Sequence, residues 1–377
     1  MIRCDALVVG GGPAGSTCAR ILRNAGWTVI VADRARFPRD KVCAGWLTPD
    51  VFSLLELAPA EYRATGATLQ EITGFQTGVI GGSLVETRYS ATVSYAIRRC
   101  EFDNFLLRRA GVRVLEETPV VSLRRRAGMW IVNDAIEARV IVGAGGHFCP
   151  VARQLRGGPE TTHPIVAREV EFRLPRGNER VPADTPRLLF SPDLRGYGWC
   201  VRKGDYVNVG LGHRDSRHFN RRLSEFTEFC GRALKVRHPP DAHWRGHAYL
   251  ASGAGARPFV GDGVLLAGDA AGLAYPKSGE GIRPAIESGR LAADVLIAAD
   301  GRCGIDDLQP YADALRRRHP PVDAGRHRAA SALVGRLLLG SAFFTRHVLL
   351  NRWFLHSHGR QGPPAGTGLE QRPAARS

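Results

Sequence analysis

Short apolar runs that end in glycine alternate with helical stretches along the first part of the chain. Residues 5–10 form one such run, and residues 13–25, which begin with a proline, have a helical pattern. A second run covers residues 28–32 and is followed directly by Asp33. Uninterrupted apolar runs are typical of parallel strands buried on both faces, and proline is tolerated in the first turn of a helix. The pattern therefore predicts a strand–helix–strand unit at the start of the chain.

The same reasoning predicts more strands further along. Residues 164–212 alternate apolar and polar positions, as in a half-buried antiparallel sheet, and residues 263–267 form another short buried strand before a helix over 280–299. A strand-rich stretch lies between the first and last of these elements, with Gly-Met and Asn-Asp as hairpin signals. Its predicted strands are 112–115, 120–123, 130–132 and 138–142.

A glycine motif lies between the first strand and the first helix. Residues 10–15 read Gly-Gly-Gly-Pro-Ala-Gly, which contains the pattern G-x-G-x-x-G. Gly10 allows the tight turn, Gly12 lets a pyrophosphate approach the helix N-terminus, and Gly15 lets helix and strand pack closely. Asp33 follows at a strand end, where a carboxylate can accept hydrogen bonds from ribose hydroxyls. The residues expected to bind a dinucleotide here are Gly10, Gly12, Ala14, Gly15, Asp33 and Arg34.

A second motif favours FAD over NAD. A predicted strand ends in Gly268-Asp269, a loop carries Pro276, and Ser-Gly-Glu-Gly at 278–281 precedes a helix. An acid at a strand end can hold the ribityl hydroxyls of a flavin. A helix N-terminus aimed at the flavin pyrimidine would stabilise the negative charge of the reduced ring. NAD needs neither feature, so we expect FAD, with Gly268, Asp269, Pro276, Gly279, Glu280, Gly281 and Ile282 among its contacts.

With these motifs the chain resembles the geranylgeranyl reductase-like branch of the flavoprotein superfamily that also holds para-hydroxybenzoate-hydroxylase-type monooxygenases and flavin halogenases. The resemblance covers about residues 1–300. The matching segments are Gly-Asp-Ala-Ala-Gly at 268–272, Ser-Gly-Glu-Gly-Ile at 278–282, Arg-Cys-Glu-Phe-Asp at 99–103, Lys-Val-Cys-Ala-Gly at 41–45 and Gly-Tyr-Gly-Trp at 196–199. It implies that Arg99 lies near the FAD, which is held without a covalent bond, and that the Cys43 turn lies near the flavin. It also implies that Tyr197 and Trp199 belong to a substrate cavity.

The chain departs from that branch at three places. The usual Gly-Ala-Asp-Gly reads Gly-Ala-Gly-Gly at 143–146, so its acid is missing. The cavity strand continues as Cys-Val-Arg-Lys at 200–203, where the reductases have Pro-Lys, and Ala44 and Trp46 replace small glycines beside Cys43. A tryptophan there would reshape whatever binds over the flavin, so these changes concern the substrate rather than the cofactor.

The predicted fold class is therefore α/β, with a discontinuous Rossmann-type FAD-binding domain, an inserted antiparallel-sheet substrate domain and C-terminal helices. The predicted FAD-binding domain comprises residues 1–50, 91–160 and 255–300, and the substrate domain 51–90 and 161–254. Residues 301–358 are expected to be helical, and the Gly-, Pro- and Arg-rich tail at 359–377 to be disordered.

The catalytic candidates are Cys43, Tyr197 and Trp199, and each has a structural alternative. Cys43 is either a catalytic thiol or a small residue in a tight turn. Tyr197 and Trp199 alternate along a strand and share one face, so they either contact substrate or only line a cavity. The twelve histidines show no metalloprotease or triad pattern, and none is assigned a catalytic role.

Composition narrows the classes of partner. The formal net charge is +16, but it is spread along the chain and dominated by arginine, so nucleic-acid binding is not expected. The eight cysteines form no CxxC pair or zinc-ligand cluster, which predicts free thiols, a cytoplasmic location and no metal site. The apolar and basic segment 343–355 allows peripheral contact with a membrane or a protein. Its apolar residues lie nearly all round a helical wheel, which favours a helix packed on the protein.

The leading function is an FAD-dependent reductase of carbon–carbon double bonds in an isoprenoid or similar apolar substrate. The alternative is a monooxygenase that hydroxylates an aromatic or indole-like substrate, including a protein side chain. A non-catalytic flavoprotein is a third reading. Halogenation is disfavoured because the chain has no lysine between residues 42 and 202 and lacks a Trp-x-Trp-x-Ile-Pro strand. No second nucleotide-binding fingerprint is present, so the sequence does not identify the electron donor. An external reductant is expected, with NADPH as one candidate.

Overall fold

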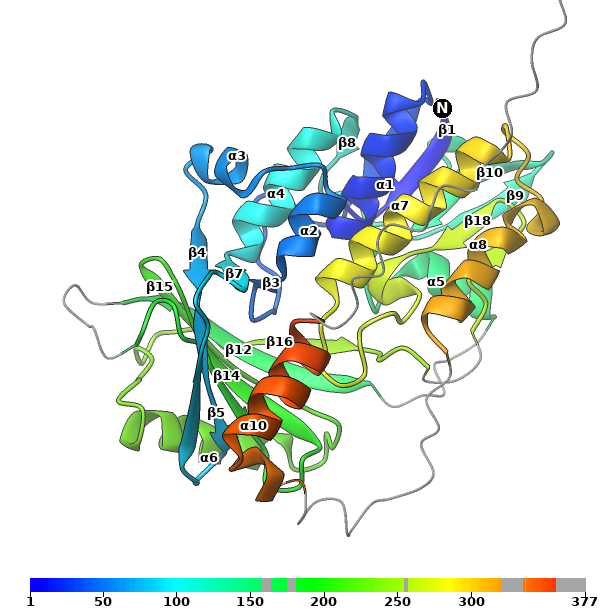
Figure 1. The fold of residues 1–377 in the computed structure, drawn as a ribbon. Helices are drawn as coiled ribbons and strands as arrows, with labels where there is room; N and C mark the ends of the chain where they lie inside the picture. Colours follow the sequence, from blue (N-terminus) through cyan, green and yellow to red (C-terminus); the bar gives the residue numbers. More distant parts are fainter. Residues whose placement is uncertain (158–163, 175–180, 254–256, 321–334, 336, 357–377) are drawn as a thin grey trace, which may run out of the picture.

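The computed structural model describes residues 1–157, 164–174, 181–253, 257–320, 335 and 337–356 (Figure 1). Two large sheets dominate it. One contains the first strands of the chain and is covered by helices, and the other is formed mainly by the middle of the chain. The predicted α/β class and the Rossmann-type arrangement are confirmed. The residues 359–377, for which disorder was predicted, lie outside the described residues.

The first sheet has eight strands, and its main path runs β17-β18-β11-β1-β2-β8. Neighbours from β18 to β8 are parallel, as expected for apolar strands covered on both faces. The antiparallel hairpin β9–β10 is added to β11. The strands are β1 (Ile2–Val9), β2 (Val29–Ala32), β8 (Arg113–Leu115), β9 (Leu123–Arg126), β10 (Met129–Val132), β11 (Ile136–Gly143), β17 (Val260–Gly261) and β18 (Val264–Leu266).

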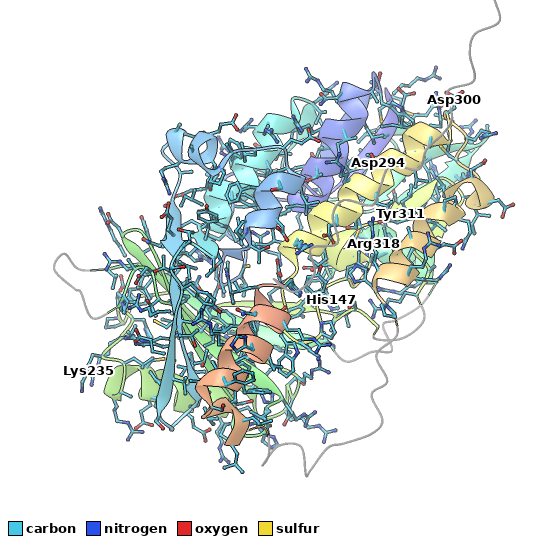
Figure 2. The ribbon with its side chains drawn as sticks, in the orientation of Figure 1. His147, Lys235, Asp294, Asp300, Tyr311 and Arg318 are labelled. Carbon is cyan, nitrogen blue, oxygen red and sulfur yellow. The ribbon has the colours of Figure 1, made fainter. Side chains whose placement is uncertain are left out.

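Helices cover this sheet, with α1 packed between α4 and α7 (Figure 1). The buried Tyr311 on α8 donates its hydroxyl hydrogen to the carbonyl oxygen of Leu266 (2.6 Å), which ties α8 to β18 (Figure 2). The helices are α1 (Pro13–Asn24), α4 (Arg99–Ala110), α5 (Pro150–Arg156), α7 (Ile282–Ala298) and α8 (Ile305–Arg318), with a 3-10 turn η1 (Gly268–Ala270).

The second sheet has seven strands in the order β16-β12-β15-β14-β13-β5-β6. Its pairs are antiparallel except β13 with β5. The strands are β5 (Gly74–Val79), β6 (Leu84–Arg88), β12 (Ile165–Arg173), β13 (Arg187–Phe190), β14 (Gly196–Lys203), β15 (Tyr206–His213) and β16 (Arg245–Tyr249). Helix α6 (Phe219–Arg232) packs on one face, and α10 (Ala342–Phe344) with the π-helical η2 (Thr345–Phe354) packs on the other.

A small sheet with the order β3-β7-β4 joins the two large ones. It consists of β3 (Trp46–Leu47), β4 (Leu69–Ile72) and β7 (Ser94–Ile97), and the helices α2 (Pro49–Leu54) and α3 (Pro59–Ala64) connect β3 to β4. Side chains of these helices share an apolar cluster with α4 and α7. The predicted domain boundaries stay a prediction. The second sheet takes strands from both sides of the segment that carries β7 and α4.

Two predicted elements are wrong in their limits. The strand predicted at 120–123 begins only at Leu123, because the side chain of Asn133 accepts the N–H groups of Val121 and Ser122 and holds them in a loop. The late helix begins at Ile282 rather than Glu280. The residue before the helix, Gly281, has φ −122° and ψ −13°, which is outside the helical region, so the helix begins only at Ile282.

The segment 343–355 packs mainly as a core helix, but not on all sides. Leu349, Leu350 and Phe354 are buried against the second sheet, whereas Phe343 is exposed. Among the described residues, no helix is both long and apolar enough to span a bilayer.

Candidate functional site

One cavity of about 690 Å³ lies where the carboxyl ends of the first sheet's strands face the second sheet. This volume is in the range of cofactor and small-molecule sites. All the residues proposed from the sequence for cofactor binding and catalysis line it except Gly15 and Pro276. The structure therefore brings together segments that are more than 200 residues apart in the chain.

The glycine-rich loop forms one end of the cavity. A Cβ added at Gly15 would lie 1.9 Å from the carbonyl oxygen of Gly10, so the close approach of α1 to β1 requires glycine there. Gly15 therefore acts in packing rather than at the cavity surface. Asp33 accepts the N–H of Gly11 (2.8 Å) and that of Ala35 (2.9 Å), so one carboxylate holds both the loop and the end of β2.

The N-terminus of α1 is open toward the cavity. No side chain caps this helix, and Pro13 occupies its first turn. The first N–H groups of a helix have no partner within it and attract anions. The guanidinium of Arg39 lies 3.4 Å from the place of an added Cβ at Gly12 and 3.2 Å from Asp103, which Arg99 also holds through two hydrogen bonds of 2.8 and 2.9 Å. This end of the cavity can hold a pyrophosphate.

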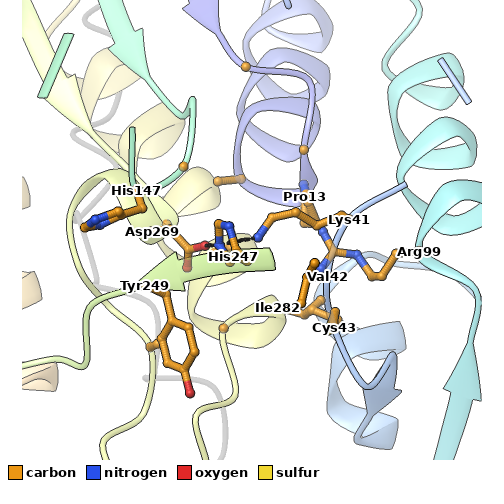
Figure 3. A pocket seen from close by; sticks show the side chains of 18 of the residues that line it. Pro13, Lys41, Val42, Cys43, Arg99, His147, His247, Tyr249, Asp269 and Ile282 are labelled. Carbon is orange, nitrogen blue, oxygen red and sulfur yellow. Dashed lines mark hydrogen bonds and ion pairs between the residues drawn. The ribbon is translucent and has the colours of Figure 1, made fainter. Parts of the chain in front are cut away.

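Three charged or titratable side chains meet in the middle of the cavity (Figure 3). Nζ of Lys41 lies 2.6 Å from Nε2 of His247 and 3.6 Å from Oδ2 of Asp269. Burial alone would raise the pKa of Asp269, but Lys41 and His247 hold that pKa well below its usual range. Burial lowers the pKa of Lys41 and of His247, and Asp269 opposes both shifts. Asp269 is therefore a carboxylate at neutral pH, as an acceptor for ribityl hydroxyls must be.

The loop before α7 forms the next part of the wall. Gly281 precedes the first turn of α7, and no side chain caps this helix either. The hydroxyl of Tyr197 donates to the carbonyl oxygen of Ser278 (2.5 Å), and the hydroxyl of Tyr249 lies against Gly279. A carboxylate oxygen of Glu280 lies 3.5 Å from Nε2 of His356. Pro276 does not line the cavity, and its carbonyl oxygen accepts a hydrogen bond from Arg214 (2.9 Å).

Two buried side chains of the second sheet, Glu169 and Lys203, hold the turn that contains Cys43. Oε2 of Glu169 accepts the N–H of Cys43 (2.7 Å), and Nζ of Lys203 donates to the Cys43 carbonyl oxygen (3.4 Å). Lys203 is 1% exposed and also pairs with Glu171 (2.8 Å). Burial raises the pKa of Glu169 to about 7, against the lowering effect of Lys203 and the Cys43 N–H. The Cys43 backbone is therefore clamped on both sides.

Aromatic side chains line the cavity beyond this turn. The rings of Trp46 and Phe354 stack with centroids 5.4 Å apart, and Tyr197 lies 5.6 Å from Phe354. Trp199 packs on Gly210, where an added Cβ would lie 2.2 Å from its ring, and its Nε1 donates to Asn208 (2.6 Å). Trp199 is thus fixed by the sheet, and it presents only its ring to the cavity.

Several lining residues were not singled out from the sequence. His247 and Tyr249 share a face of β16 because they are two residues apart, which was the only signal for them. Phe354 was visible only as part of the apolar segment 343–355. Glu169, which holds the Cys43 turn from outside the cavity wall, had no local signal. Lys41 lies in the cavity, so the lack of a lysine between residues 42 and 202 does not by itself argue against halogenation. The missing Trp-x-Trp-x-Ile-Pro strand remains the sequence argument against that reaction.

The residues present fit FAD. The cavity offers a carboxylate for a ribose at Asp33, an uncapped helix start with Arg39 nearby for a pyrophosphate, and the ionised Asp269 for ribityl hydroxyls. A second uncapped helix start, at α7, can face a flavin ring. Gly12 leaves open space toward the cavity, and any larger residue would fill it.

Comparisons with known proteins agree with this fit. The family model described as "FAD binding domain" matches residues 3–317. The menaquinone reductase of Mycobacterium tuberculosis is 31% identical over 322 residues, which cover 78% of this chain and 77% of that protein.

Solved structures show the same fold at lower identity. A geranylgeranyl bacteriochlorophyll reductase-like protein of Thermoplasma acidophilum has a TM-score of 0.69 and 22% identity, with 90% of this chain and 88% of that chain covered. PqsL of Pseudomonas aeruginosa, named as a probable FAD-dependent monooxygenase, has a TM-score of 0.63 and 22% identity, with 90% and 96% covered. The chain thus belongs to the FAD binding domain family, its motifs resemble the geranylgeranyl reductase-like branch, and it is an FAD-dependent oxidoreductase.

Proposed function

We propose that this enzyme reduces carbon–carbon double bonds of an isoprenoid or similarly apolar substrate. The observation that carries the proposal is the position of the Cys43 turn, between the residues that fit FAD and an aromatic wall. That wall consists of Trp46, Tyr197, Trp199, Tyr249 and Phe354. An aromatic cavity suits an apolar chain, and the relative named menaquinone reductase supports a substrate of this kind.

Each part of the cofactor end has a proposed task. The start of α1 and Arg39 bind the pyrophosphate, Asp33 binds the adenosine ribose, and Asp269 orients the ribityl chain. Arg99 fixes Asp103 and through it Arg39. The start of α7, with Gly279, Gly281 and Ile282, holds the pyrimidine edge of the ring, and its helix dipole stabilises the charge of the reduced cofactor.

The reduction needs a hydride for one carbon and a proton for the other. FAD, when bound and reduced by an external donor such as NADPH, supplies the hydride. We assign the proton to the Cys43 thiol, because it lies at the junction and its backbone is clamped by Glu169 and Lys203. Tyr197 and Trp199 then hold the substrate against the loop at 278–281 and exclude water from it.

A second candidate is hydroxylation of an aromatic substrate. The specific observation in its favour is the stacked pair Trp46–Phe354, since a planar ring could stack in the same geometry. In this case the aromatic wall would orient the ring, and Cys43 would have no proton to deliver.

Anaerobic and aerobic assays separate the two candidates. The holoenzyme, reduced by NADPH without oxygen, is mixed with geranylgeranyl diphosphate or with menaquinone, and the products are analysed by mass spectrometry. The reductase proposal expects a product heavier by two hydrogens under anaerobic conditions. A product formed only with oxygen, and labelled by ¹⁸O₂, would replace that proposal with the monooxygenase.

A further inference from the structure

The C-terminal segment over the second sheet exposes a cluster of large apolar side chains. Leu337 is 73% exposed, Leu338 38% and Phe343 72%, and all three lie within seven residues. The other large apolar side chains exposed in the described part of the chain, such as Val121 and Ile305, are scattered along the sequence. A single exposed apolar residue is ordinary, but such a cluster indicates an interaction surface.

The opposite side of the same segment packs on the protein, and its Phe354 lines the cavity. Leu339, Leu349, Leu350 and Phe354 are buried in the apolar cluster that also contains Trp46, Tyr197 and Trp199. The segment therefore has one side on the protein's aromatic cavity and the other in solvent. Figure 1 shows α10 on the outer surface of the second sheet.

The surroundings of this cluster are basic. Arg346 and Arg352 are exposed on the same segment, and Lys277 lies over the ring of Trp353 at 4.4 Å. Burial and the nearby Arg352 lower the pKa of Lys277. Arg346 lies over the ring of Tyr89 and donates to the carbonyl oxygen of Arg88, and in the described part of the chain neither Arg346 nor Arg352 forms an ion pair. The sequence from 324 to 369 contains six arginines and no Asp or Glu.

We propose that Leu337, Leu338, Phe343, Arg346 and Arg352 form a docking face for an anionic lipid bilayer. Apolar side chains beside cations match the boundary between acyl chains and negative headgroups. A protein partner would need acidic groups to complement this face, whereas a bilayer supplies both the apolar and the anionic component. The docking itself does not depend on which reaction the FAD site performs.

Vesicle sedimentation of the FAD-loaded protein tests this face. We expect binding to vesicles in which one third of the lipid is phosphatidylglycerol, and much weaker binding to pure phosphatidylcholine or at high salt. The double variant Leu337→Ser/Phe343→Ser should bind at least about tenfold more weakly, because each buried apolar side chain contributes roughly that factor. Arg346→Gln/Arg352→Gln should weaken binding about tenfold and reduce the salt dependence.

Val121→Ser is the matched control, because Val121 is 79% exposed but stands far from this segment in the chain. It should bind vesicles like the unmodified protein. FAD content and melting temperature of every variant show whether the fold is intact. The proposal is overturned if the unmodified protein does not bind anionic vesicles, or if the apolar double variant binds as tightly. It is also overturned if that variant instead converts a dimer to a monomer in solution, since the face would then bind a second copy of the chain.

Discussion

At the cofactor end of the cavity most side chains come from short loops that each follow a strand, whereas at the aromatic end they come from four separated elements. Gly10, Gly12 and Asp33 belong to one β-α-β unit, and Asp269 and Gly281 belong to a second loop. Trp46, Tyr197, Tyr249 and Phe354 belong to β3, β14, β16 and η2. The comparison teaches that cofactor binding is encoded locally, while substrate choice depends on how distant segments pack.

The two ends also differ in how a substitution should act. At the cofactor end, backbone groups and fixed charges meet a ligand of defined shape, so one added methyl group or one lost carboxylate removes binding. At the aromatic end, rings contact one another over broad surfaces, so a substitution should change the shape of the site before it abolishes a function.

The largest effect is expected for Gly12→Val. An added Cβ at Gly12 would meet only the flexible end of Arg39, so the protein should fold, but the side chain would occupy the place of the pyrophosphate. The purified variant should retain no FAD, measured by absorbance. Gly231→Val on α6 is the control, since its added atom would make only ordinary contacts with Arg237, and it should stay yellow. A full complement of FAD in Gly12→Val would contradict the assignment.

Asp269→Ala should also abolish FAD retention. The variant loses the ionised acceptor and leaves Lys41 without its carboxylate partner, 3.6 Å away. Titration of the apoprotein with FAD, followed by flavin fluorescence, measures the loss. Asp262→Ala removes an exposed ion pair with Arg125 and should bind FAD normally. Equal affinities of the two variants would show that Asp269 is not a cofactor ligand.

Cys43→Ser tests the junction between the two ends. If the thiol delivers the proton, turnover should fall about 100-fold, which is the lower end of the rate contribution of a positioned general acid. FAD affinity should change by less than about twofold. Cys100→Ser is the control, because Cys100 is half-buried on α4 and is not part of the cavity wall. Turnover that stays unchanged in Cys43→Ser would limit this residue to packing of the turn.

Trp46→Gly should act on substrate choice and stability and leave the cofactor in place. The variant loses ring contacts with Phe75 and Phe354, at a cost of about 3 kcal/mol of unfolding free energy. Relative rates with short and long isoprenoid substrates should shift toward bulkier ones. Trp244→Gly, in the other apolar cluster of the second sheet, should lose stability without that shift. Loss of FAD from Trp46→Gly would mean that the two ends are not separable.

The smallest effect is expected for Glu169→Gln and appears as a pH dependence. Burial raises the pKa of Glu169 from 4.5 to about 7, so folding favours its protonated form. The contribution to stability is full below pH 4.5 and is lost as the pH rises through 7. Gln keeps an acceptor for the Cys43 N–H and does not ionise. The variant should therefore gain about 2 kcal/mol relative to the unmodified protein between pH 5 and pH 8. Melting temperatures across this range measure the gain, and parallel curves for the two proteins would contradict it.

Much of the cofactor end was predictable because its motifs are short and each residue has a geometric reason. The tight turn at Gly10, the close approach at Gly15 and the strand-end acids follow from backbone geometry within one or two elements. The hairpin between β10 and β11 was likewise predicted, from the Asn133-Asp134 pair. In the structure both residues adopt a positive φ, as a tight turn requires. The limits of β9 were not, because the side chain of Asn133 holds Val121 and Ser122 outside the strand.

The aromatic end could be predicted only as far as the family motif reached. Tyr197 and Trp199 alternate on a strand, so their common face was visible in the sequence. Phe354 was seen only as part of an apolar segment, and nothing near it indicates that it stacks on Trp46, 308 residues earlier. Glu169 reads as an ordinary polar position in an alternating strand, although it is 6% exposed and holds the Cys43 turn.

The sequence by itself determined the FAD-binding unit, the α/β class and the candidate turn at Cys43, because these depend on spacings of a few residues and on backbone conformations that only glycine adopts easily. Only the tertiary structure decided which side chains line the cavity, how Lys41 and His247 keep Asp269 ionised, and which side of the C-terminal segment is exposed. Burial, and the pKa shifts and ring contacts that burial causes, arise where distant elements meet. No local pattern in the chain contains that information.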